Sequence, residues 1–384
     1  MSFRKSHPLV KIVNSTLIDL PAPANLSVNW NYGSLLGLVL VIQLVRGIVL
    51  ATRFSGHVDM SFDSVIMLYQ DSNYGWLIRL VHSTGASFFF LFIYLHIGRN
   101  LYYGSYIYPE LWNIGVIIYL ILIGTAFLGY VLPWGQISYW AATVITNLLS
   151  AIPYLGKIVV EWVWGGFAVS NPTLTRFFAL HYLLPFVITA LVVIHIFYLH
   201  QEGSSNPLGI SSSTNKVAFH YFYSVKDLYV YFVSIFFFIV FTLKYGYLFI
   251  DAENWIPANA LVTPNHIQPE WYFLFAYAIL RSIPNKLGGV IGLLASVIIL
   301  FTFPLIGSNL YFRGFFYHPL SRVLFWLFVS NFLLLTWLGR CPAESPFVEV
   351  ALSSTVVYFF LTALILTSQY FFSYFYSKSY YEAF

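Results

Sequence analysis

Two segments of the sequence, HSTGASFFFLFIYLH (residues 82–96) and HYLLPFVITALVVIH (residues 181–195), decide the fold. Each segment is apolar apart from a few hydroxyl residues, and each begins and ends with a histidine, 14 residues apart. On an α-helix, at about 100° per residue, this spacing falls about 40° short of four turns and spans about 21 Å. Both histidines of a segment therefore share one helix face. The repeated spacing predicts two long helices that carry matching histidines.

The composition places these helices in a membrane. Of the 384 residues, 59% are hydrophobic and 8% are charged, whereas about 25% of the residues in a soluble domain are charged. A membrane-spanning helix needs about 20 apolar residues. The sequence predicts an all-α membrane protein with eight transmembrane helices, short interfacial helices and both termini on one side. The predicted spans are residues 32–52, 76–98, 111–132, 177–199, 228–247, 288–308, 322–339 and 349–372.

The charge and cysteine content exclude other classes of protein. The net charge is +4 and no basic run exceeds two residues, so a nucleic-acid partner is excluded. Cys341 is the single cysteine, which excludes a disulfide framework and a thiolate metal cluster. Residues 1–13 lack the apolar core of a cleavable secretory signal.

A polar stretch, residues 200–227, separates the fourth predicted span from the fifth. It predicts two domains of four spans each, residues 1–208 and 209–384. Two other long connections, residues 133–172 and 247–288, lie on one membrane face because each follows an odd number of reversals. Within them, Ile137–Leu149 and Trp271–Ile283 predict short helices at the membrane interface.

The second and fourth spans run in the same direction, so His82 is level with His181 and His96 with His195. Two imidazoles that face each other suit the two axial positions of a haem iron, and this ligation favours electron transfer because no position stays open. A hydrogen-bonded core histidine is the alternative for any one of the four. A zinc or copper site would need ligands three or four residues apart, or carboxylates beside them, and these segments have neither.

Glycines repeat the spacing of 14 in the first and third spans, as Gly33 with Gly47 and Gly115 with Gly129. Because glycine has no side chain, these two spans would leave room for a flat macrocycle at each of the two histidine levels. Ordinary packing of small residues between helices is the alternative for each glycine.

Two arginines stand just outside the histidine levels. Arg79 precedes His82 by three residues and Arg99 follows His96 by three. A guanidinium there would pair with a haem propionate. An arginine that extends toward the membrane interface is the alternative.

Six segments carry a resemblance to a known family. They are WNYGSLLG (30–37), HSTGAS (82–87), GYVLPWGQ (129–136), TVITNLLSAIP (143–153), PEWY (269–272) and LRSIPNK (280–286). Over essentially its whole length the chain resembles cytochrome b of the mitochondrial and bacterial quinol:cytochrome c reductases, in the fused respiratory form. The resemblance implies a multi-pass protein of the mitochondrial inner membrane, with the bacterial cytoplasmic membrane as the alternative.

The resemblance implies two non-covalent haems b within residues 1–208. His82 and His181 would hold the low-potential haem near the outer side, and His96 and His195 the high-potential haem near the matrix. The termini would then face the matrix.

The resemblance also implies an outer pocket in which quinol is oxidised. The loop from Pro133, the helix of residues 141–150 and the segment PEWY would build this pocket. Glu270 would accept a proton, since burial can tune a carboxylate toward the working pH, and Tyr130 and Tyr277 would line the pocket. An exposed loop acid is the alternative for Glu270. Ala141 replaces the usual glycine, so we expect quinol to fit but rigid pocket inhibitors to bind poorly.

An inner site for quinone reduction is implied on the opposite side. Reduction consumes protons, and a histidine with an aspartate at the membrane face would supply them. A solvated loop histidine is the alternative. The implied residues are Asn31, His200, Ser204, Lys226 and Asp227.

The implied activity is that of the catalytic cytochrome b subunit, which passes electrons from quinol through both b haems to quinone and contributes to the proton gradient. With one cysteine, the chain has no ligands for an iron–sulfur centre. Its expected partners are therefore a Rieske iron–sulfur protein, cytochrome c1 and other complex III subunits, in a dimer within membrane lipid. Two rivals are a two-haem transmembrane reductase without a quinol site and a proton-relaying transporter, which would need acids at the bilayer midplane.

Overall fold

The computed structural model describes residues 3–309 and 314–382. Within these ranges, eight helical segments are long and apolar enough to cross a membrane, which confirms the predicted spans. The long helices are α3 (Tyr32–Ala51), α5 (Gly75–Tyr102), α6 (Pro109–Val131), α9 (Asn171–Glu202), α10 (Phe222–Tyr245), α12 (Lys286–Ile298), α13 (Pro319–Arg340) and α14 (Phe347–Glu382).

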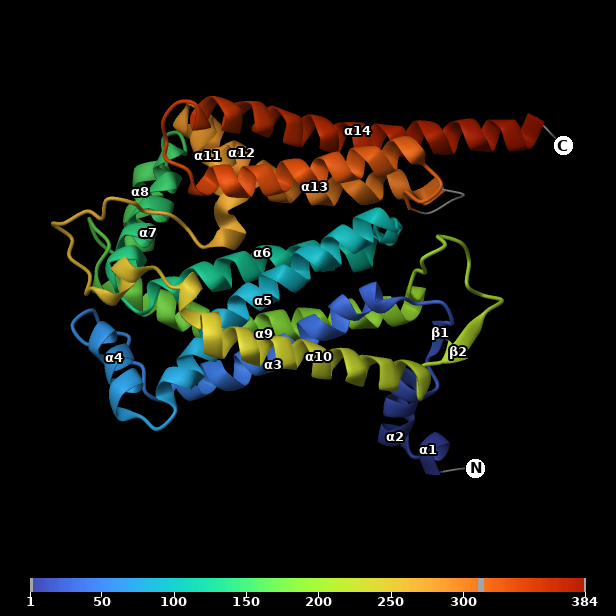
Figure 1. Ribbon diagram of the computed structural model, residues 1–384, viewed down its shortest axis with the longest axis horizontal. Coiled ribbons are helices and arrows are strands. Elements are labelled where there is room, and N and C mark those ends of the chain that lie inside the picture. The colour runs from blue at the N-terminus through green and yellow to red at the C-terminus, as the bar shows by residue number, and fades with distance from the viewer. Residues whose placement is uncertain (1–2, 310–313, 383–384) are drawn as a thin grey trace.

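The spans pack in two groups (Figure 1). In the first group α5 packs against α3 and α6 against α9, while α13 and α14 pack together in the second. Helix α10, the fifth span, contacts α3 and α5 of the first group. The domain boundary at residue 208 stays a prediction.

Local sequence explains where two spans differ from their predicted limits. Helix α9 begins six residues early, because Ser170 caps it in a reciprocal pair of hydrogen bonds with Thr173. Helix α12 ends at Ile298 and continues as the 3₁₀ segment η8 (Ile299–Asn309). Pro304 lies in this segment, where its missing N–H could not donate to the carbonyl of Leu300 in an α-helical ladder.

The connections that follow the first, third and fifth spans contain short helices. Helix α7 (Gln136–Asn147), and η7 (Trp271–Phe273) followed by α11 (Leu274–Ser282), confirm that both predicted segments form short helices. Their position at the membrane interface stays a prediction. The sequence analysis missed α4 (Ser61–Asp71) and α8 (Gly156–Trp164). The remaining elements are α1 (Phe3–Ser6), α2 (Pro8–Val13), η1 (Asn14–Ile18), η2 (Val28–Asn31), η3 (Ser105–Ile107), η4 (Leu148–Ala151), η5 (Gly246–Phe249) and η6 (Ala252–Trp255), with strand β1 (Pro21–Pro23) antiparallel to β2 (Lys216–Ala218).

The main core lies where the two groups meet. It joins aromatic residues of α5 and α6 to η7, α11, α13 and α14, with Phe90, Tyr119, Tyr272 and Phe275 among its buried members. Because η7 and α11 belong to this core, the segment PEWY is held between the two helix groups.

Candidate functional site

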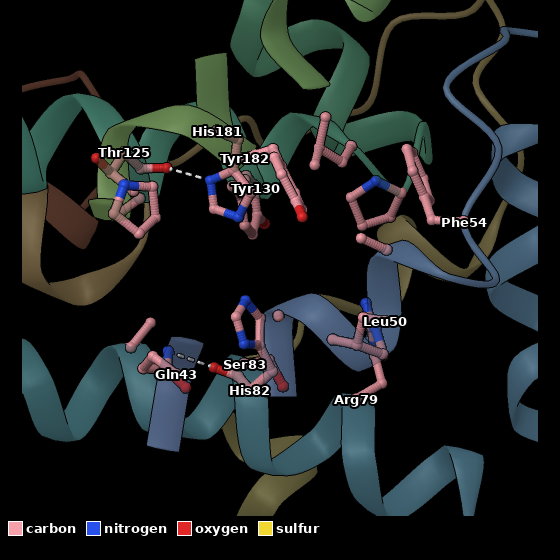
Figure 2. Close-up of a pocket in the computed structure, with 18 of the residues that line it drawn as sticks. Gln43, Leu50, Phe54, Arg79, His82, Ser83, Thr125, Tyr130, His181 and Tyr182 are labelled. Carbon is pink, nitrogen blue, oxygen red and sulfur yellow. Dashed lines mark hydrogen bonds between the residues drawn. The ribbon is translucent and has the colours of Figure 1, made fainter. Parts of the chain in front are cut away.

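The structure brings the four membrane histidines together in two facing pairs. The ring centres of His82 on α5 and His181 on α9 lie 6.2 Å apart, and Figure 2 shows both rings pointing into the space between the helices. The rings of His96 and His195 lie 6.5 Å apart. Two imidazoles that bind one metal from opposite sides, each through a bond of about 2 Å, have ring centres about 6 Å apart. Both pairs therefore fit the axial ligands of a haem iron.

A hydrogen bond orients the ring of His181 in the first pair, called the outer pair after its predicted side of the membrane. Nδ1 of His181 donates a hydrogen bond to the carbonyl oxygen of Thr125 at 2.8 Å, and the side-chain amide of Gln43 donates to the backbone carbonyl of His82 at 2.9 Å (Figure 2). A histidine whose Nδ1 donates in this way leaves Nε2 free as a metal ligand. Within the described residues, Nδ1 of His82 is buried without a hydrogen-bond partner.

Each glycine of the repeated spacing receives one histidine ring. A Cβ atom on any of the four would lie within 3.4 Å of a histidine Cε1 atom. The pairs are Gly33 with His96 (3.4 Å), Gly47 with His82 (3.3 Å), Gly115 with His195 (3.2 Å) and Gly129 with His181 (2.3 Å). The missing side chains thus admit the histidine rings. The room that the sequence analysis expected for a macrocycle stays a prediction.

One cavity of about 260 Å³ joins the outer histidine pair to the segment PEWY. Helices α3, α5, α6 and α9 form its walls, and residues of the outer connections close it. The lining includes Arg79, His82, Tyr130, Pro133, His181, Glu270 and Tyr272. A molecule that reaches Glu270 is therefore in the same chamber as the outer pair.

The environment of Glu270 suits a proton acceptor. Burial raises the pKa of this carboxyl to about 8, and the nearby carboxylate of Asp251 acts in the same direction. Tyr277 does not line this cavity; its hydroxyl donates to the carbonyl of Ile267 at 3.4 Å. Ala141 is buried and does not line the cavity either. The roles of these residues stay predictions.

Two aromatic residues, Tyr69 and Trp255, contact Arg79 at the cavity wall and form an aromatic clamp. Its guanidinium donates a hydrogen bond to the Tyr69 hydroxyl at 2.9 Å and lies 5.3 Å from the centre of the Tyr69 ring. The ring of Trp255 lies 5.4 Å away. The sequence analysis missed Tyr69 and Trp255, because no spacing links them to Arg79 in a chain that is 21% aromatic.

Arg99 lies beside the inner pair. Its Nη2 atom is 3.4 Å from Nδ1 of His96, and its guanidinium lies 5.1 Å from the centre of the Trp30 ring. Each histidine level thus has one guanidinium nearby that could neutralise an anionic group.

The structure brings together only some of the residues predicted for the inner quinone site. The side-chain amide of Asn31 donates a hydrogen bond to the carboxylate of Asp227. The ammonium group of Lys226 instead donates to the carbonyl oxygen of Leu26. In the part of the chain that the structure describes, no hydrogen bond joins the Asn31 and Asp227 pair to His200 or Ser204.

Comparisons with known proteins agree with this architecture. The chain matches the family models described as Cytochrome b/b6/petB over residues 17–203 and Cytochrome b(C-terminal)/b6/petD over residues 257–359. It is 78% identical over 379 residues to Cytochrome b of Brachionus plicatilis, covering 99% of this chain and 100% of that protein.

A solved chain described as Hyperthermophilic respiratory Complex III is 31% identical, with a TM-score of 0.89, and the match covers 95% of this chain and 98% of that chain. The full-length relative and the eight apolar helices confirm the predicted multi-pass location in the mitochondrial inner membrane. The chain belongs to the cytochrome b family.

Proposed function

We propose that this cytochrome b, a subunit of respiratory complex III, holds two non-covalent haems b, one between His82 and His181 and one between His96 and His195. The ring separations of 6.2 and 6.5 Å support this assignment, as do the glycines that admit the rings. Bound haem with two histidine ligands supplies one-electron transfer without an open iron position. Arg79 and Arg99 would pair with the propionates.

We infer that quinol is oxidised in the outer cavity. The single observation that carries this inference is that Glu270 and the outer histidine pair line one cavity. Glu270 would accept a proton from quinol, since a carboxyl with a pKa of about 8 can both take up and release a proton near neutral pH. Tyr130 would help to orient the substrate from α6, and the apolar walls would exclude water.

Quinone would be reduced at the inner membrane face. The Asn31 amide fixes the Asp227 carboxylate there, and Asp227 with His200 would deliver protons from the matrix. Ser204 and Lys226 would complete this site. Protons would thus leave on the outer side and enter on the inner side.

The partners follow from what the chain lacks. Its single cysteine cannot ligate an iron–sulfur centre, so an iron–sulfur protein and a cytochrome c1 would supply the remaining redox groups of a dimeric complex.

The test is a haem count by the pyridine haemochrome spectrum, with a redox titration, on the purified complex. We expect two protohaems per chain with separate potentials. His82→Leu should remove the component that titrates at the lower potential, and His96→Leu the other. One haem or none in the unmodified complex would overturn the assignment. Normal haems without quinol oxidation would instead favour the two-haem transmembrane reductase.

A further inference from the structure

Helix α5 carries a stripe of three residues, Ser87, Phe90 and Tyr94, on a different face from its histidines. Ser87, Phe90 and Tyr94 follow the spacing i, i+3, i+7, which places them on one helix face. At about 100° per residue this face is turned roughly 130° from the face of His82 and His96. The stripe therefore faces the second helix group, and Phe90 also lines the outer cavity.

All three residues of the stripe contact Trp271 or Tyr272. The indole Nε1 of Trp271 donates a hydrogen bond to the Ser87 hydroxyl at 3.1 Å. The rings of Phe90 and Tyr272 are stacked, with centres 4.0 Å apart and planes 2° from parallel. The Tyr94 hydroxyl donates to the backbone carbonyl of Tyr272. One helix face thus holds two side chains and one backbone carbonyl of the segment PEWY.

These contacts are buried, so they constrain the segment strongly. The exposed fraction is 4% for Ser87, 0% for Phe90 and 4% for Tyr272. A buried polar group that loses its partner bears the full cost of desolvation.

Glu270 immediately precedes the two anchored residues. Glu270 lines the outer cavity together with Phe90 and Tyr272, so a shift of the anchored residues moves Glu270 relative to that cavity. The titratable groups that interact with it are Tyr130, Asp251 and Tyr272. Arg79 interacts with Tyr130, and His82 and His181 lie farther along the lining.

We propose that Ser87, Phe90 and Tyr94 are positioning residues for quinol oxidation, which fix Trp271 and Tyr272 against α5 and thereby hold the Glu270 carboxyl in the outer cavity. This rests on the proposed function, because it gives Glu270 the role of proton acceptor. Helix α5 then carries His82 of the outer pair on one face and positions Glu270 through the contacts of another face. One helix therefore positions both groups.

The test uses the purified complex with Tyr94→Phe, which removes one hydroxyl and keeps the ring. We expect the KM for quinol to rise about threefold to tenfold, because the variant loses the hydrogen bond to the Tyr272 carbonyl and the long one that the Tyr119 hydroxyl donates at 3.5 Å. The acid limb of the pH profile of kcat/KM should move to lower pH as the Glu270 carboxyl gains water. Haem content and both haem potentials should stay as in the unmodified complex.

The matched control is Tyr358→Phe. Tyr358 is also buried and its hydroxyl also donates to a backbone carbonyl, that of Ser296 at 2.8 Å, but it does not contact Trp271 or Tyr272 through this bond. We expect an unchanged KM and pH profile in this variant.

Ser87→Ala provides an independent variant, with Ser87→Thr as its rescue because threonine keeps the hydroxyl. If the complex with Tyr94→Phe does not assemble, the comparison of Ser87→Ala with Ser87→Thr tests the positioning role. Normal haem spectra with an unmodified KM and pH profile in Tyr94→Phe, or in Ser87→Ala, would overturn the positioning role. Absence of two b haems from the unmodified complex would instead overturn the proposed function.

Discussion

A Cβ atom on Gly129 would lie 2.3 Å from Cε1 of His181. Real Cβ atoms do not approach other atoms so closely, so any side chain at position 129 must displace the ligand ring or the helix that carries it. Gly129 on α6 thus leaves the space that the His181 ring of α9 occupies.

Gly129→Ala should therefore impair the outer haem site. Overpacking of this kind costs about 1–3 kcal/mol, and we expect the low-potential haem component to shift in potential or to be lost while the inner component stays. The pyridine haemochrome spectrum and a redox titration measure this. Gly124→Ala on the same helix is the control, because a Cβ there meets no atom within 4 Å. Equal effects of the two substitutions would contradict the explanation.

The rate of quinol oxidation should depend on the protonation of Glu270. Burial raises the pKa of this carboxyl to about 8, and only the ionised form accepts a proton, so the rate should rise as the pH increases through about 8. Glu270→Gln should lower the rate by about 10²-fold or more and abolish this limb. Glu344→Gln, at an exposed position, should leave the profile unchanged. If the rate of Glu270→Gln still rises with pH through about 8, another group is responsible for this pH dependence.

The aromatic clamp on Arg79 should influence the potential of the outer haem. Tyr69→Phe removes the hydrogen bond to the guanidinium but keeps the ring. A less firmly held cation stabilises the reduced haem less, so we expect the outer potential to fall by a few tens of millivolts. The inner potential serves as the internal control. A fall of both potentials would indicate a general disturbance of the helices.

The pair of Asn31 and Asp227 should affect only the inner reaction. Asp227→Asn removes the carboxylate that accepts the Asn31 hydrogen bond and can no longer carry a proton. We expect slower quinone reduction at the inner face and an unchanged first turnover of quinol in the outer cavity, as measured by stopped-flow haem reduction. Asp19→Asn, an aspartate near Arg4 and Lys5, is the control. A defect in the first outer turnover would contradict the assignment.

Ala141→Gly should increase the sensitivity to rigid inhibitors of the outer pocket, because it removes a buried methyl group from α7, the helix that the resemblance assigns to this pocket. An inhibitor titration on both forms of the complex checks this. Equal sensitivity would show that this methyl group does not limit inhibitor binding.

The sequence by itself determined the membrane class, the eight spans and the register of the four histidines. These features depend on local composition and on the period of one helix, which any stretch of about 20 residues carries within itself. The segment PEWY and Glu270 were recognised through resemblance, without a local physical pattern to place them in a pocket.

Only the tertiary structure decided which distant residues complete the sites. The Tyr94 hydroxyl meets the carbonyl of Tyr272 across 178 positions of sequence, and Trp271 meets Ser87 across 184. The clamp of Tyr69 and Trp255 on Arg79 likewise joins two outer connections to α5. Such contacts depend on how whole helices pack, and aromatic residues are so frequent in this chain that no local pattern distinguishes the few that hold the functional groups in place.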